Sequence, residues 1–174
     1  MAGGFGKRLK RLTKTCPKPL LKYKNKPLIQ HIIDKASNQG FKNFYISIYY
    51  LKDKIKRYFN KNKNKKININ YLEEKIPIGT IGSLRLLKNI SKNFVVLNCD
   101  VITDVNMNEV INFHIKKNCL MTMCIKHYRY QNPYGVIKSK NSLFKGFEEK
   151  PSIDVKINAG IYIFSSRIVD FIKK

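Results

Sequence analysis

The N-terminal segment combines glycines and cations in a spacing that suits a triphosphate. Gly3, Gly4 and Gly6 lie within four positions, and Lys7 and Arg8 follow them directly. Glycine lets the backbone approach a bulky ligand, and successive backbone N–H groups in such a turn form a concave anion site. Because an arginine fork matches phosphate oxygens, we interpret the segment as a triphosphate cradle. The alternative is a glycine-rich loop beside an incidental basic run, since a short glycine pattern is a weak motif.

A further cation and a carboxylate complete the chemistry expected around phosphate. Lys18 lies between Pro17 and Pro19, which restrict the backbone and so hold the cation in place. Asp100 follows the apolar run 94–97 and is a candidate ligand for Mg²⁺, which prefers hard oxygen donors together with phosphate. The alternative for Asp100 is a turn or helix-capping aspartate.

A second glycine turn, at residues 79–83, precedes an expected helix. Gly79, Thr80, Gly82 and Ser83 are small enough to admit a flat base or sugar. The N-terminus of a helix also offers N–H donors to an anionic ligand. We therefore count these residues as candidates for nucleotide binding, and the alternative is a plain tight turn.

Three short polar groups further along the chain are candidates for binding sugar hydroxyls. They are Tyr134-Gly135, Glu149-Lys150 and Asn158-Ala159-Gly160. A carboxylate or an amide oxygen accepts hydrogen bonds from hydroxyls, and the small residues leave room for a ring. The alternatives are a β-turn for the first group and a surface charge cluster for the second.

Positioning these groups requires a sheet whose strand ends meet, and hydrophobic periodicity predicts one. Helices are expected at residues 27–38, 51–59, 80–89, 106–117 and from 165, and strands at 43–50, 67–72, 94–97, 120–126, 135–139, 143–147 and 158–164. This alternation predicts an α/β, Rossmann-like, doubly wound and mostly parallel (mixed) sheet. Ligands of such sheets bind beyond the carboxyl ends of the strands.

Composition limits the remaining possibilities. The 174 residues suit a single domain, 1–174, and no apolar run approaches the length of a membrane span. The net charge is +24, but arginine supplies only six of the 35 cations and the lysines are spread along the chain. Lysine, asparagine and isoleucine are all abundant and have A/T-rich codons, so we expect no specific nucleic-acid partner and only salt-sensitive binding to polyanions. The four cysteines have no CxxC spacing, which favours reduced thiols in a cytoplasmic protein.

Taken together, these motifs resemble those of the sugar-phosphate nucleotidyltransferases. The resemblance runs from Ala2 through Arg8, Lys18, the 79–83 turn and Asp100 to Asn158-Ala159-Gly160, in the family's order. It implies a glycosyltransferase-A-like nucleotidyltransferase fold. It also implies the reaction NTP + sugar 1-phosphate → NDP-sugar + pyrophosphate, with Mg²⁺ as cofactor. Within the family the chain is most similar to guanylyltransferases, including the mannose-1-phosphate and amino-sugar enzymes, which favours GTP as the nucleotide.

The resemblance also implies residue roles. Ala2, the glycines and Lys7 would contact the nucleotide, Arg8 the β- and γ-phosphates, and Lys18 the α-phosphate and the sugar phosphate. Asp100 would bind Mg²⁺. Among the remaining candidates, the family pattern assigns nucleotide binding to Gly79, Thr80, Gly82 and Ser83, and sugar binding to Tyr134, Gly135, Glu149, Lys150, Asn158 and Gly160.

The chain departs from the family pattern at four places. Arg11 replaces a proline, and Cys99 replaces a glycine before the metal aspartate. The family's first strand and its second metal aspartate have no counterpart, so we expect a domain truncated at both ends with weak or no turnover. Alternatives are a non-catalytic relative that binds nucleotide or sugar phosphate, and a basic nucleic-acid-binding domain. A homo-oligomer is also compatible with the sequence.

Overall fold

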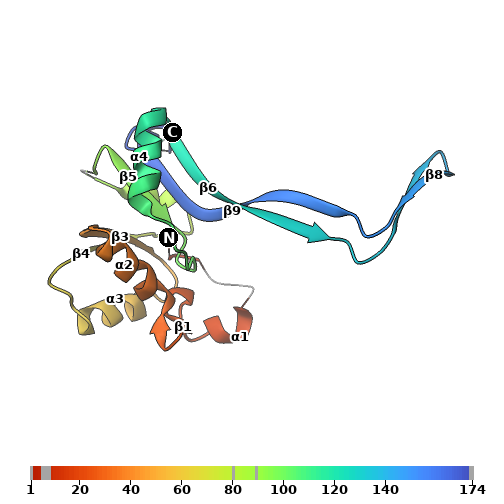
Figure 1. Ribbon diagram of the computed structural model, residues 1–174. Coiled ribbons are helices and arrows are strands. Elements are labelled where there is room, and N and C mark those ends of the chain that lie inside the picture. The colour runs from red at the N-terminus through yellow and green to blue at the C-terminus, as the bar shows by residue number, and fades with distance from the viewer. Residues whose placement is uncertain (1, 5–8, 80, 89, 173–174) are drawn as a thin grey trace. The chain divides into compact units, whose positions relative to one another are not determined.

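The computed structural model describes residues 2–4, 9–79, 81–88 and 90–172 (Figure 1). The chain divides into two compact units, the first formed by Met1–Thr122 and Gly160–Lys174 and the second by Met123–Ala159. The expectation of one catalytic domain over residues 1–174 stays a prediction. Within the described ranges, no helix is long and apolar enough to cross a membrane.

The first unit contains a parallel strand pair covered by two helices. Strand β3 (Asn43–Ile48) pairs in parallel with β4 (Asn68–Glu73). Helices α2 (Leu28–Asn38) and α3 (Lys52–Lys61) pack on one face of this pair (Figure 1). Their apolar residues recur every three or four positions and meet alternate residues of β3, so that Ile33, Ile46 and Ile55 are buried together. The helices and strands predicted in this region are confirmed to within a few residues.

The same unit contains a three-stranded sheet in the order β5-β9-β6. Strand β5 (Asn93–Leu97) is antiparallel to β9 (Ser152–Ser165), and β6 (Met121–Gln131) lies on the other side of β9. Helix α4 (Met107–Lys117) begins after Asn106, whose side chain accepts hydrogen bonds from the backbone N–H groups of Asn108 and Glu109. A second core joins β4, β5 and β9 to the 3₁₀ helix η3 (Gly82–Leu86) and to α5 (Ile168–Ile172).

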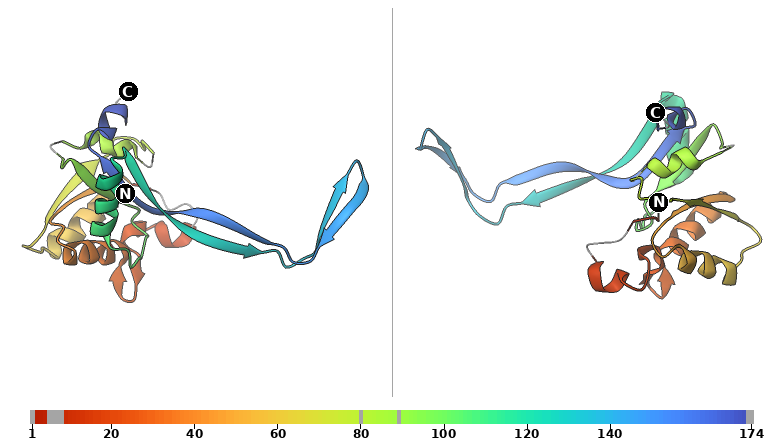
Figure 2. Two further views of the ribbon diagram at one scale, coloured as in Figure 1. Left: turned by 45° about the horizontal axis from the view of Figure 1, so that its top comes forward. Right: turned by 180° about the vertical axis from the view of Figure 1, so that it is seen from behind.

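The second unit is built from antiparallel strands. Strand β7 (Val136–Lys140) pairs antiparallel with β8 (Leu143–Glu148), and both strands were predicted to within a residue. The remaining parts of β6 and β9 run side by side before this hairpin (Figures 1 and 2), and Arg129 forms an ion pair with Asp154. Many of its apolar side chains are exposed, including Phe144 and Phe147.

The structure corrects two predictions of secondary structure. The helix predicted at 80–89 is wrong, because the described residues form only the short η3: Gly79 has a φ of +81° and the chain becomes extended again at Leu87. Strands β6 and β9 are longer than predicted, since they continue together into the second unit. In strand β5 only Val96 is buried, and the other four residues are half-buried.

Four short elements between the glycine segment and α2 were not predicted. They are α1 (Lys10–Thr13), η2 (Lys18–Leu20), β1 (Lys22–Tyr23) and β2 (Lys26–Pro27). Each is too short to produce a hydrophobic period. The predicted α/β class with a mixed sheet is confirmed, and its parallel component among the described strands is the β3–β4 pair.

Candidate functional site

The start of the glycine segment is fixed to the carboxyl end of β3. The backbone N–H of Ala2 donates to the carbonyl oxygen of Ser47 at 3.1 Å, and the Ala2 side chain is buried. A Cβ added to Gly3 would lie 3.0 Å from Glu74 Oε1, so this close approach favours glycine. Gly4 has no neighbour within 4 Å of the corresponding position and is exposed. The predicted site residues Gly6, Lys7 and Arg8 lie outside the described residues.

Glu74 connects the two glycine segments, and the sequence analysis did not identify it. Its Oε1 accepts a hydrogen bond from Ser47 Oγ at 2.6 Å, and its Oε2 accepts one from the backbone N–H of Ile78 at 3.2 Å. The residue is only 9% exposed, although it follows directly after β4. A buried carboxylate must be hydrogen-bonded, and Glu74 meets this need by joining the end of β3 to the start of the second turn, with Gly3 packed beside it. The sequence signal was available: Glu73 and Glu74 are adjacent, and strand alternation places them on opposite faces.

The second glycine turn is compact. Gly79 has the positive φ that favours glycine, and a Cβ on Gly82 would lie 3.0 Å from Ile78 Cβ. Ser83 is 1% exposed and begins the buried side of η3. Thr80, which we predicted to bind nucleotide, lies outside the described residues. The turn is therefore packed between Glu74 and the second core.

Lys18 and Asp100 form an ion pair, although 82 positions separate them in the sequence. Pro17 and Pro19 are both fully buried on either side of the lysine, so they fix the backbone of η2 that carries it. Both charged side chains remain partly exposed, at 29% for Lys18 and 39% for Asp100. Two predicted catalytic residues are thus brought together, with their charged ends accessible to a ligand.

Gly160 lies against the loop that carries Asp100. Its φ is +72°, its carbonyl accepts from the Asn98 backbone N–H at 2.9 Å, and a Cβ there would lie 2.7 Å from Asn98 Nδ2. Cys99 packs against the core cluster that contains Ala2, which links this loop to the glycine segment. Burial raises the pKa of the Cys99 thiol, and the neighbouring Asp100 carboxylate acts in the same direction.

The other predicted sugar-binding residues belong to the second unit. Gly135 packs tightly, since a Cβ there would lie 2.2 Å from Phe147 Cζ and 3.1 Å from Glu149 Oε2. Lys150 lies 3.9 Å from Glu149 through Nζ and Oε1, and both side chains are more than half exposed. Tyr134 is 75% exposed, and Asn158 is also exposed. Within this unit, Gly135 and the Glu149–Lys150 pair lie together.

The donor set offers one carboxylate for a divalent metal. No group of three His, Cys, Asp or Glu side chains that could hold a metal lies among the described residues. Mg²⁺ is commonly bound through one or two carboxylates together with substrate phosphates and water. Asp100 fits that pattern, because it is accessible and already accepts a cationic partner in Lys18.

The comparisons with known proteins now place the chain. The family described as nucleotidyl transferase matches residues 1–174. The chain belongs to the nucleotidyl transferase family. Members of this family generally use a divalent metal.

Among curated relatives, the chain is similar to the mannose-1-phosphate guanyltransferase of Yarrowia lipolytica, with 36% identity over 99% of the chain. It is 32% identical to the catalytic subunit beta of mannose-1-phosphate guanylyltransferase from Xenopus tropicalis, again over 99% of the chain. These matches cover 50% and 51% of the relatives, so the chain spans about half the length of the curated relatives it matches.

Solved structures support the same fold. HddC from Yersinia pseudotuberculosis aligns with a TM-score of 0.74 and 24% identity, covering 98% of this chain and 76% of that one. A UDP-glucose pyrophosphorylase complexed with UDP-glucose aligns with a TM-score of 0.70 and 24% identity, covering 97% and 75%. At these identities the likeness establishes the fold of a family member, and it confirms the predicted nucleotidyltransferase architecture.

Proposed function

We propose that this chain forms the nucleotide-binding part of a sugar-1-phosphate nucleotidyltransferase, with GTP as the favoured nucleotide. The observation that carries the proposal is the Lys18–Asp100 ion pair in a member of this family. It joins a cation and a carboxylate from distant parts of the sequence, and Cys99 connects their loop to the buried Ala2. The names of the curated relatives favour a guanylyl group and mannose 1-phosphate over other substrates.

The proposed reaction is an in-line displacement. An oxygen of the sugar phosphate forms a bond to the α-phosphorus of the NTP while the bond from that phosphorus to the bridging oxygen breaks. Pyrophosphate then leaves with the electron pair. Such phosphoryl chemistry depends mainly on positioning and on neutralising charge.

Each residue in the site then has a defined task. The backbone of Ala2, Gly3 and Gly4 lies along the nucleotide, and Lys18 holds the α-phosphate and the incoming sugar phosphate close together. Arg8 contacts the outer phosphates and Asp100 holds the metal, which we propose to be Mg²⁺. When bound, that metal supplies positive charge to the phosphate oxygens.

The remaining predicted residues would select the substrates. Gly82 would lie near the base or sugar. Gly135, Glu149 and Asn158 would accept or admit sugar hydroxyls, and Lys150 would lie near the sugar phosphate. Because the described cysteines are free thiols, as is usual in a reducing compartment, we propose a cytoplasmic location.

A non-catalytic nucleotide-binding role is the second candidate. It is favoured by the donor set, because no group of three His, Cys, Asp or Glu side chains that could hold a metal lies among the described residues. Binding would then occur without pyrophosphate release.

One experiment separates the two candidates. The 174-residue chain is incubated with GTP, Mg²⁺ and mannose 1-phosphate, and pyrophosphate is measured alongside thermal stability. Turnover predicts pyrophosphate that depends on the sugar phosphate, whereas a binder predicts a higher melting temperature without product. Both candidates would be rejected if no pair of NTP and sugar phosphate gave either pyrophosphate or a higher melting temperature.

A further inference from the structure

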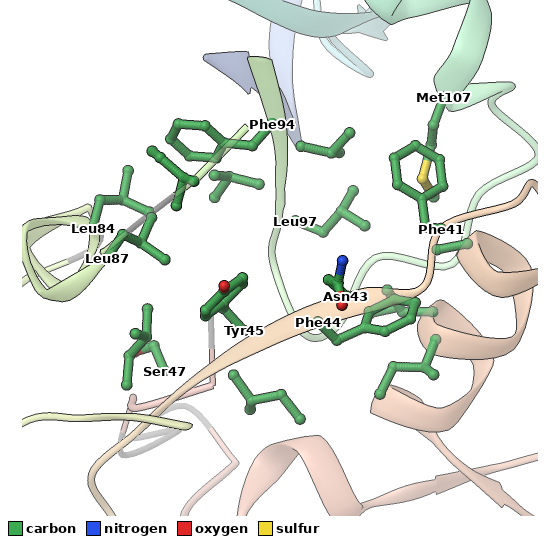
Figure 3. A pocket seen from close by; sticks show the side chains of 18 of the residues that line it. Phe41, Asn43, Phe44, Tyr45, Ser47, Leu84, Leu87, Phe94, Leu97 and Met107 are labelled. Atoms are coloured by element: carbon green, nitrogen blue, oxygen red, sulfur yellow. The ribbon is translucent and has the colours of Figure 1, made fainter. Parts of the chain in front are cut away.

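The first turn of helix α4 is capped from two sides. An α-helix leaves its first N–H groups without partners inside the helix. The side chain of Asn106 accepts from two of these groups, those of Asn108 and Glu109. The third belongs to Met107, whose side chain lines a cavity of about 550 Å³ that residues of β3 and β5 also line (Figure 3). Because Met107 is only 2% exposed, its N–H needs a partner within the protein.

Gln39, the residue that directly follows α2, supplies that partner. Its Oε1 accepts from the Met107 N–H at 2.7 Å, and its Nε2 donates to the Val105 carbonyl at 3.2 Å. Its own backbone carbonyl accepts from Asn108 Nδ2 at 3.0 Å. Three hydrogen bonds therefore fasten the start of α4 to the end of α2.

The loop that carries Asp100 is held at both ends. Residues 98–106 form neither helix nor strand. At the first end the Asn98 N–H donates to the Gly160 carbonyl at 2.9 Å, and at the other end Gln39 holds Val105 and the first residue of α4. Because a loop of this kind is positioned by the elements that it connects, the Gln39 contact helps to determine where Asp100 lies.

Helix α2 also supports the ion-pair partner of Asp100. The segment that carries Lys18 meets the N-terminal end of α2, where the Leu28 N–H donates to the Leu21 carbonyl at 2.9 Å. The same helix thus contacts the Lys18 segment at its first residue and the Asp100 loop at its C-terminal cap, Gln39. A hydrogen-bonded helix of 11 residues is a stiff spacer, so its two ends keep these segments at a fixed separation.

We propose that Gln39 is a positioning residue for Asp100. By joining the end of the 98–106 loop to α2, it sets where the carboxylate lies relative to Lys18. This role deepens the proposed function and rests on it, because it requires Asp100 to hold the metal. Without the Gln39 side chain, Asp100 remains in the chain but is less well placed to bind Mg²⁺.

Two glutamines at α2 allow a matched test. Gln39→Met keeps the length of the side chain and removes both of its hydrogen bonds. Gln30→Met is the control, because Gln30 also uses both amide atoms: it donates to Asp34 Oδ1 at 2.7 Å and accepts from Tyr58 Oη at 3.1 Å. These partners lie in α2 and α3, so the control removes equivalent bonds that do not involve the 98–106 loop.

The first measurement uses no ligand. Amide hydrogen exchange is followed residue by residue by NMR in the 174-residue chain. The Met107 N–H should exchange about threefold faster or more in Gln39→Met, as expected for the loss of one hydrogen bond. Gln30→Met should leave that rate unchanged. An unchanged Met107 rate in Gln39→Met would overturn the proposed role.

The second measurement compares the affinity for GTP with Mg²⁺ and with EDTA by isothermal titration. The ratio of the two affinities reports what the metal contributes. Removing a direct partner of a metal ligand costs about tenfold or more in metal affinity, and Gln39 acts from further away, so we expect Gln39→Met to lower the ratio by about threefold or more. Gln30→Met should leave the ratio unchanged. A merely structural loosening would lower both affinities and leave the ratio as it is.

A double variant shows whether the effect passes through Asp100. In an Asp100→Asn background, Gln39→Met should lower the ratio no further. A further fall of the same size, or an unchanged ratio in Gln39→Met alone, would overturn the role of Gln39. If Asp100→Asn itself leaves the ratio unchanged, the proposed metal site fails and the role of Gln39 fails with it, so the two failures are distinguishable.

A milder variant covers the case in which Gln39→Met does not fold. Gln39→Glu retains an oxygen for the Met107 N–H and loses the donor to the Val105 carbonyl. It should lower the ratio in the same direction and by less than Gln39→Met. A ratio in Gln39→Glu equal to that of the unmodified chain would count against the role of Gln39 in the same way.

Discussion

At the scale of single residues, Lys18 is the charged group whose placement is best defined. Its backbone is held between two buried prolines, and its ammonium group is paired with Asp100. Replacing it with methionine keeps most of the apolar stem and removes the charge. A hydrogen bond to a charged group contributes about 1.5–3 kcal/mol, so we expect Lys18→Met to weaken Mg²⁺–GTP binding by about tenfold or more.

Isothermal titration of the variant measures this change. Lys26→Met is the matched control, because Lys26 forms an exposed ion pair with Asp34, whose side chain projects from α2. Equal affinity of both variants for Mg²⁺–GTP would remove Lys18 from the proposed site.

Glu74 offers a second residue-scale prediction, which concerns stability. Glu74→Gln leaves one acceptor oxygen for two donors, the Ser47 hydroxyl and the Ile78 N–H, so one of these donors loses its partner. A buried group left unsatisfied costs about 1–3 kcal/mol, so we expect the free energy of unfolding in urea to fall by that amount.

The neighbouring Glu73 supplies the control. It is exposed and pairs with Lys52 and Lys56, which lower its pKa chiefly through side-chain hydrogen bonds. Exposed ion pairs are screened by water, so Glu73→Gln should lose less stability than Glu74→Gln. The reverse order would show that Glu74 does not organise the two glycine segments.

Which site residues could be predicted depended on how they act. Lys18 was a candidate because it lies between two prolines, and Asp100 because it follows an apolar strand; the structure pairs them, and their roles stay a prediction. Glu74 acts through backbone contacts that form only after folding, so its role was hidden in an ordinary acidic pair. Cys99 was identified only as a residue that departs from the family pattern. Its burial against the core cluster that contains Ala2 depends on tertiary packing, which the sequence does not show.

At the scale of elements, helix α4 carries a buried histidine. His114 is 1% exposed, its Nδ1 lies 2.8 Å from Thr122 Oγ1, and burial lowers its pKa below the ordinary 6.5. Below pH 6.5 the unfolded chain therefore binds a proton that the folded chain does not yet bind. The free energy of unfolding should consequently fall as the pH decreases through this window.

Urea unfolding between about pH 7.5 and 5 measures the effect, since these values bracket the ordinary histidine pKa. We expect His114→Gln to flatten the pH dependence of stability. His127→Gln, at an exposed position in β6, should retain the dependence of the unmodified chain. A profile for His114→Gln that is as steep as that of the unmodified chain would contradict the assignment.

The predictability of the elements followed their length. Helices α2 and α4 span enough residues to show a clear period, and Asn106 identified the start of α4. The prediction of a longer helix at 80–89 failed because apolar spacing does not show where a helix ends. The glycines and the buried, extended Leu87 limit the helix to the short η3. The extensions of β6 and β9 arise from pairing across a long sequence separation, which no local window detects.

At the scale of the whole molecule, the chain matches its curated relatives over about half their length. The second unit exposes large side chains such as Tyr134, Phe144 and Phe147. An apolar set of this kind commonly marks a surface that is covered by other protein. The exposed side chains of the second unit therefore form a candidate surface for contact with other protein.

The net charge of +24 gives the last prediction, which concerns polyanions. Because the cations are spread, we expect binding to a mixed-sequence DNA duplex that depends on the total charge and not on a particular site. The affinity should fall about a thousandfold or more between about 50 and 200 mM salt if six or more phosphates are contacted. Fluorescence anisotropy over a salt series measures the slope.

A triple variant tests whether the charge is local. Lys63, Lys65 and Lys66 are exposed in the densest basic run, between α3 and β4. Changing all three to glutamine removes three of the 35 cations, so it should leave most of the affinity and lower the salt slope only slightly. Loss of most of the binding, or tight binding that persists at about 200 mM salt, would instead identify a dedicated nucleic-acid surface. Such a result would favour the nucleic-acid alternative over a general effect of charge.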